Sequence, residues 1–262
     1  MSFIIEKLRG QVAAVGAERP LADLKFAWIA TAVLCAFFIG VRTYEQFFHR
    51  TAGIDAFSEE FQLYWLSVLY IEEVAEVLCF FLLVAYFWKT RDLDLANVEP
   101  REELRRMFHL LGWLFVYGVA LYWGTSYFNE QDAAWRDVAY RHSAYIHLNL
   151  IKVFVATPVY IIVGMGAFMY AQTRVPTFAS KGFSIALVCL VFGPLLILPA
   201  FGFVEWGNTS WIPEEMFVAP FDWPLVFFGW FTLGVFGVTL LIHGRLQELS
   251  AGYEEVVGIT PE

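Results

Sequence analysis

Acidic, basic and polar side chains collect in one stretch of this sequence, NEQDAAWRDVAYRHSAYIHLN, which lies between two long apolar runs. Within it Asp132 and Arg136 are four residues apart, about one turn of an α-helix, and Asn149 follows further on. A second polar stretch, VEWGNTSWIPEEMFVAPFD, contains Asn208 and Asp222. Carboxylate and amide oxygens dominate both stretches and no thiolate is present. The residue types alone therefore do not indicate a site for a soft or borderline metal ion.

Two histidines follow in the first stretch. His142 and His147 are five residues apart, which separates them by about 140° around a helix, so they do not chelate one ion from a single regular helix. All five histidines of the chain lie at or beyond the ends of apolar runs, whereas a transmembrane haem needs ligands deep in facing helices. We therefore interpret the histidines as polar residues at a membrane interface.

Three carboxylates lie inside a long apolar run, residues 61–88. Glu72 lies eleven residues past Phe61, about 16 Å along a helix. A charged side chain at the centre of a bilayer costs about 2.5–3.5 kcal/mol, and Glu73 and Glu76 add to that cost. Glu72 and Glu76 share one helix face. The pattern predicts a proton path, a docking site for a partner subunit, or carboxyl groups that are protonated or hydrogen-bonded to another helix.

Composition indicates which elements position these side chains. Of the 262 residues 59% are hydrophobic and only 16% are charged, too few to cover a soluble domain of this size. Crossing a bilayer core takes about 20 apolar residues, and six such runs are present: 26–44, 61–88, 107–128, 148–170, 183–203 and 223–242. We expect an all-α, polytopic membrane protein with about six transmembrane helices in residues 26–242, an amphipathic N-terminal segment at 1–25 and a tail at 243–262.

Lysine and arginine are distributed unevenly around these runs. Twelve lie in the N-terminal segment, the second and fourth loops and the tail, four lie on the opposite side, and Lys152 lies inside a run. Because cytoplasmic segments are enriched in basic residues, we expect both termini in the cytoplasm and Asp132 on the outer side. The segment PREELRR predicts a helix start, with Pro100 in the first turn, Glu102 and Glu103 near the N-terminal dipole, and a Glu102–Arg106 pair. The net charge of −9 does not indicate a nucleic-acid partner.

Several motifs resemble one family of membrane proteins. They are YFWKTRDLDL, PREELRR, GWLFVYGVALYWGTSYFNEQDAAW, VGAFMYAQTRVP, EWGNTSW and EEMFVAPFDWPLVFFGWFTLGVFGV. Together they cover most of residues 86–240 and are similar to the C subunit of the copper membrane monooxygenases, the family of particulate methane monooxygenase and ammonia monooxygenase. The resemblance implies a protein of a bacterial inner or intracytoplasmic membrane, assembled with A- and B-type subunits as a trimer of heterotrimers. Such a complex inserts one atom of dioxygen into methane, a short alkane or ammonia.

The resemblance also implies copper, held in the C-type chain by an Asp-x3-His-x12-His pattern, with a second group of ligands in an Asn-x3-His-x13-His pattern. The corresponding residues are Asp132, Arg136 and Asn149 for the first pattern, and Val204, Asn208 and Asp222 for the second. Only the aspartate matches by type. The spacing is kept and the imidazoles are lost, so the resemblance supports the fold and the assembly but carries over neither copper site.

The substitutions have a physical interpretation. A carboxylate that loses a divalent cation keeps an uncompensated negative charge, and arginine one turn away supplies a fixed positive charge without becoming a ligand. An Asp132–Arg136 ion pair is therefore the expected replacement for the metal site. Two alternatives stay open. One is a relocated site that uses Asp137, His142 or His147, and the other is an oxygen-rich site for a hard cation formed by Asp132, Asn149, Asn208 and Asp222.

We therefore expect the C-type subunit of a diverged, copper-dependent membrane monooxygenase. In this interpretation the chain supplies scaffold, substrate path and contacts between subunits, and its own copper site is lost or altered. The alternative is a non-catalytic regulatory or duplicate subunit on the same scaffold, or a conduit for protons or small solutes that uses Glu72, Glu73 and Glu76.

Overall fold

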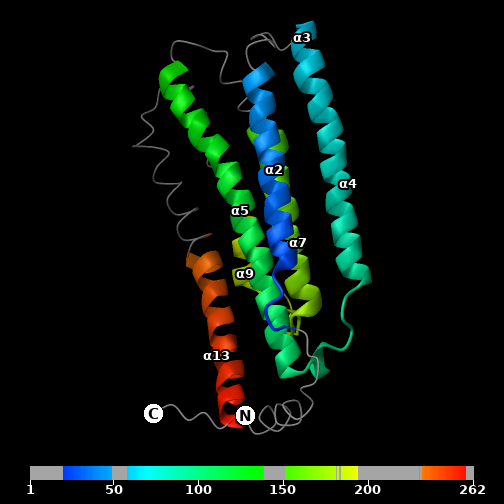
Figure 1. Cartoon of the computed structure of the whole chain (residues 1–262), viewed down its shortest axis with the longest axis vertical. Coiled ribbons are helices and arrows are strands. Elements are labelled where there is room, and N and C mark those ends of the chain that lie inside the picture. Colours follow the sequence, from blue (N-terminus) through cyan, green and yellow to red (C-terminus); the bar gives the residue numbers. More distant parts are fainter. Residues whose placement is uncertain are drawn as a thin grey trace. The chain divides into compact units, whose positions relative to one another are not determined.

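The computed structural model describes residues 20–48, 58–138, 151–180, 182, 184–193, 230 and 232–257, without the side chains at 46, 48, 125, 127–138, 152–153 and 252–257. Every regular element in these residues is a helix (Figure 1), which confirms the predicted all-α fold. The elements are α2 (Lys25–Phe48), α3 (Glu59–Phe61), η1 (Gln62–Leu66), α4 (Ser67–Lys89), η2 (Leu95–Asn97), α5 (Pro100–Val138), η3 (Lys152–Ala156), α7 (Thr157–Arg174), α8 (Pro176–Ala179), α9 (Ile185–Phe192) and α13 (Gly237–Val257).

Three of the described helices contain a segment long and apolar enough to cross a membrane: Lys25–Glu45, Pro100–Gly124 and Phe154–Arg174. They overlap the predicted runs 26–44, 107–128 and 148–170. The 23 residues of α4 would also reach across a bilayer core, but three glutamates and a lysine interrupt its apolar sequence. The runs 183–203 and 223–242 lie partly outside the described residues. The chain is thus an all-α membrane protein, and the total of six transmembrane helices stays a prediction.

Local signals in the sequence explain where several helices begin. Pro100 opens α5, with Glu102 and Glu103 in the first turn, as predicted. Ser58 caps α3, because its hydroxyl accepts a hydrogen bond of 3.2 Å from the Phe61 amide. Ser184 caps α9 in the same way, accepting a bond of 3.3 Å from the Leu187 amide.

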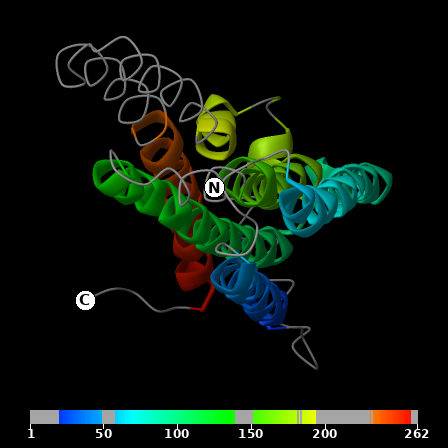
Figure 2. The ribbon, with the colours of Figure 1, turned by 90° about the horizontal axis from the view of Figure 1, so that it is seen from above.

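The described chain divides into two compact units, and α5 and α7 contribute residues to both. The first unit contains Met1–Asp23, Arg91–Leu110 and Phe168–Glu262, and the second contains Leu24–Thr90 and Leu111–Ala167. The second unit is built around an apolar core of Phe38, Phe61, Trp65, Leu69, Ile151, Val155 and Ala156. Against this core the ring of Phe38 stacks on Trp123, with centroids 5.6 Å apart and planes 8° apart. This contact holds α2 beside the second-unit part of α5 (Figure 2).

In the first unit, α9 packs against α13 and the turn that precedes it (Figure 2). The indole nitrogen of Trp230 donates a hydrogen bond of 3.1 Å to the Leu190 carbonyl. Gly234 allows the two backbones to approach, because a Cβ atom there would lie 2.6 Å from the Leu190 backbone nitrogen and 2.8 Å from the Cys189 carbonyl carbon. Glycine at this position is therefore required for close helix packing, as is common in membranes.

Gly234→Ala is expected to destabilise the protein by about 1–3 kcal/mol, because the added methyl group forces α9 away from its neighbour. Gly244→Ala in α13 is the matched control, since a Cβ atom there meets nothing within 4 Å. It should be neutral or slightly stabilising, since alanine favours helix by about 0.5–1 kcal/mol over glycine. The measurement is the free energy of unfolding in mixed micelles. Equal effects of the two substitutions would contradict the close approach at Gly234.

Candidate functional site

A polar cluster lies in the second unit where the end of α2 meets α5; we call it the Arg42 cluster. Arg42 Nη1 donates to Oε2 of Glu45 at 3.1 Å, and Arg42 Nη2 donates to the Ser126 hydroxyl at 3.4 Å. Glu45 is only 3% exposed, so its charge requires the guanidinium beside it. The Tyr44 hydroxyl donates to the Tyr64 carbonyl and joins α2 to η1 as well. The sequence analysis did not predict this cluster, because Arg42 and Ser126 are 84 residues apart and only packing brings them together.

The residues at the family's first ligand pattern follow the Arg42 cluster along α5. That helix is continuous to Val138 and therefore contains both Asp132 and Arg136. Asp132 lies six residues after Ser126, about 9 Å further along the axis, and Arg136 lies about one turn beyond it. The side chains of both residues are outside the described part of the structure, so their ion pair stays a prediction.

The remaining residues of the predicted sites also fall outside the described residues. They are Asn149, Asn208, Asp222, His142 and His147, and Asp137 is described only as part of α5. Among the residues that are described, no group of three histidine, cysteine, aspartate or glutamate side chains could hold a metal ion.

The three carboxylates predicted to lie within the membrane all belong to α4 and differ in their surroundings. Glu76 is buried, with 8% of its surface exposed, and Glu73 is exposed. The carboxyl oxygens of Glu72 and Glu76 have no hydrogen-bond partner among the described residues, and the two side chains are close enough to influence each other electrostatically. The prediction that Glu72 and Glu76 share a helix face fits this proximity, and no described cation neutralises them.

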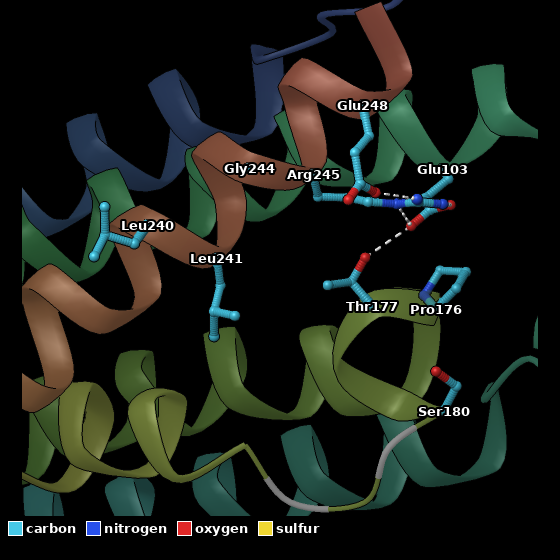
Figure 3. Close-up of a pocket in the computed structure, with 9 residues that line it drawn as sticks. All are labelled: Glu103, Pro176, Thr177, Ser180, Leu240, Leu241, Gly244, Arg245 and Glu248. Carbon is cyan, nitrogen blue, oxygen red and sulfur yellow. Dashed lines mark hydrogen bonds and ion pairs between the residues drawn. The ribbon is translucent and has the colours of Figure 1, made fainter. Parts of the chain in front are cut away.

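A second polar cluster lies in the first unit and joins α5, α8 and α13; we call it the Glu103 cluster. Arg245 donates two hydrogen bonds to Glu103, from Nε to Oε1 at 3.0 Å and from Nη2 to Oε2 at 2.7 Å. The Thr177 hydroxyl donates to Glu103 Oε1 at 2.8 Å, and Arg245 Nη1 reaches Glu248 at 2.7 Å. Figure 3 shows the guanidinium held between the two carboxylates. Glu103 is 4% exposed, so this two-pronged pair fixes a nearly buried charge.

A cavity of about 410 Å³ opens beside the Glu103 cluster (Figure 3). Its other lining residues are Pro176, Ser180, Leu240, Leu241 and Gly244. All three guanidinium nitrogens of Arg245 donate hydrogen bonds: Nε and Nη2 to Glu103, and Nη1 to Glu248. The cluster therefore joins α5, α8 and α13 through polar side chains that bond to one another.

Arg106 organises the neighbouring loop of the first unit. Its Nε lies 2.9 Å from Glu102 Oε1, which confirms the predicted Glu102–Arg106 pair. Its Nη1 also reaches Asp92 at 2.8 Å and the Arg174 carbonyl at 2.8 Å. The Asp94 amide and then Arg106 lower the pKa of Asp92 below its ordinary value. Because the charged form is favoured, the contribution of Asp92 to stability is present at neutral pH and is lost as pH falls through that lowered pKa.

Exposed apolar helix faces, segments long and apolar enough to cross a membrane, and ion pairs of nearly buried carboxylates define an integral membrane protein. Residues 9–252 match the family described as the C subunit of ammonia monooxygenase/methane monooxygenase, and the chain belongs to this family. It is therefore a C-type subunit of a membrane monooxygenase, a family whose complexes contain copper. A search of curated protein sequences finds no match to the chain.

Proposed function

We propose that this chain is the C-type subunit of a complex that oxidises methane, a short alkane or ammonia with dioxygen, and that its own copper site is lost. In that role it supplies scaffold, a substrate path and contacts with A- and B-type subunits. The observation that carries the proposal is the family match over residues 9–252, combined with the loss of imidazoles at constant spacing.

The donors at the family's copper positions do not suit copper. Asp132 is the only residue of a type the family uses, and the guanidinium of Arg136 does not deprotonate to bind a metal. Asn149 offers an amide, which suits hard cations better than copper. We therefore assign no chemical step in this chain to a copper ion.

An Asp132–Arg136 pair accounts for the residues that remain. Both belong to α5, whose position is fixed nearby by the Arg42 cluster and by the Phe38–Trp123 stack. An aspartate left unpaired in a partly buried place costs several kcal/mol, and an arginine one turn away offsets that cost. The pair neutralises the charge of Asp132 where the family's pattern has a metal.

A tagged copy of this chain, extracted gently from native membranes, tests the proposal. We expect two further membrane subunits to copurify and the complex to consume oxygen when methane, a short alkane or ammonia is added. Membranes with an untagged chain control for carry-over, and copper chelation should abolish the oxygen uptake. A stable monomer without copurifying subunits, or an intact complex that oxidises none of the three substrate types, would contradict the proposed function.

A further inference from the structure

One face of α4 is exposed although it is strongly apolar. Tyr70, Val74, Val77 and Phe81 are 65%, 61%, 49% and 64% exposed, at the spacing of a single helix face. Glu73 is exposed in the middle of them. We call these five residues the α4 outer face. The buried residues of α4 are Leu69, Glu76 and Phe87, so the helix packs on its own unit through a different stripe.

Glu73 cannot be left against lipid tails without a large penalty. Lipid tails supply no hydrogen-bond donor, and a charged carboxylate near the bilayer centre costs about 2.5–3.5 kcal/mol, roughly a 70- to 400-fold bias against exposure. The neighbouring carboxyl groups raise the cost of a negative charge at Glu73. Glu76 is nearly buried, and no described donor or cation approaches Glu72 or Glu76. Within the described part of the chain, no basic side chain pairs with this group of carboxylates.

We propose that the α4 outer face docks a transmembrane helix of another subunit of the monooxygenase complex, and that this helix places a lysine or arginine opposite Glu73. The partner must be helical, because a segment in lipid has to satisfy its own backbone hydrogen bonds. A second copy of this chain is disfavoured, because two identical faces would bring Glu73 against Glu73. The inference rests on the proposed function, since it requires the complex to exist.

A photo-crosslinking residue at Val77, one turn from Glu73, tests the contact in the intact native complex. We expect ultraviolet light to join Val77 to a peptide of another membrane subunit that contains a lysine or arginine within an apolar run. The same photo-crosslinking residue in place of Val33, which is 63% exposed on α2, is the control and should not form a crosslink to that peptide. Adducts of Val77 only with lipid or only with this chain would overturn the proposal.

Charge reversal gives a second readout. Glu73→Lys should reduce copurification of the crosslinked subunit by about tenfold or more, because like charges then meet at low dielectric. Glu60→Lys, the same change at an exposed position outside the apolar face, should not. Changing the partner's basic residue to glutamate should rescue Glu73→Lys. Rescue instead by Lys152→Glu in η3, which packs on α4, would place the counter-charge in this chain and overturn the proposal.

The outcomes also separate this inference from the proposed function. An intact, active complex in which Val77 contacts only lipid refutes the α4 interface and leaves the proposed function standing. Failure to isolate any complex refutes both.

Discussion

Replacing Arg136 and Asn149 together by histidine is expected to add about one copper ion per chain to the purified complex. The two changes complete the Asp-x3-His-x12-His pattern on Asp132, giving a carboxylate and two neutral imidazoles, a donor set that binds divalent first-row metals well. They also remove the fixed positive charge that would repel a cation. Metal content by mass spectrometry measures the gain, and nitrogen hyperfine structure in the electron paramagnetic resonance spectrum shows whether imidazoles bind the added copper.

One single substitution and one matched double variant control this experiment. Arg136→His alone should add no copper, because position 149 still lacks an imidazole. Arg136→Gln with Asn149→Gln removes the same charge without supplying ring nitrogens, so it should also bind none. A double-histidine variant that folds, assembles and yet gains no copper would show that the helices of this chain no longer converge around Asp132.

Arg245→Ala is expected to cost about 3 kcal/mol of stability, the lower end of the range for breaking a buried ion pair. The substitution leaves Glu103, whose side chain is 5% exposed, without its two strongest donors. We take the lower end because the Arg245 side chain is 25% exposed and water screens part of the interaction. The measurement is the free energy of unfolding in mixed micelles at neutral pH.

Two variants show whether the buried carboxylate causes that loss. Glu248→Ala removes the other partner of Arg245, but Glu248 is 64% exposed, so it should cost only about 0–1 kcal/mol. Adding Glu103→Gln to Arg245→Ala should recover part of the stability, because an uncharged amide is cheaper to bury than an unpaired carboxylate. If Arg245→Ala were no more costly than Glu248→Ala, the Glu103 cluster would not hold α5, α8 and α13 together.

Local chemistry made some features predictable from the sequence. Pro100, with Glu102 and Glu103 in the same turn, marks the start of α5, and the four-residue spacing of Glu102 and Arg106 sets up their ion pair without help from the rest of the fold. Run length likewise located the apolar segments at 26–44 and 148–170, because the bilayer core sets the number of residues required.

Contacts between distant parts of the chain were not predictable in this way. Arg245 and Glu103 are 142 residues apart, and Arg42 and Ser126 are 84 apart, so each pair forms only after the helices pack. From the sequence, Arg42 and Arg245 contributed only to the count of basic residues that predicts membrane orientation. For the candidate metal site, spacing placed Asp132 and Arg136 one turn apart, and the continuity of α5 supports that arrangement. The placement of Asn149, Asn208 and Asp222 depends on the tertiary fold, which spacing does not determine.

Anomalous diffraction at the copper absorption edge, from crystals of the native complex, tests whether this chain has lost its copper site. We expect copper peaks elsewhere in the complex and none at this chain's Asp132, whose carboxylate should contact the Arg136 guanidinium. The peaks in other subunits show that copper was retained during purification. A copper peak within about 2.0–2.5 Å of an Asp132 oxygen, the usual range of metal–ligand bonds, would contradict the claim that this C-type subunit has lost its own metal site.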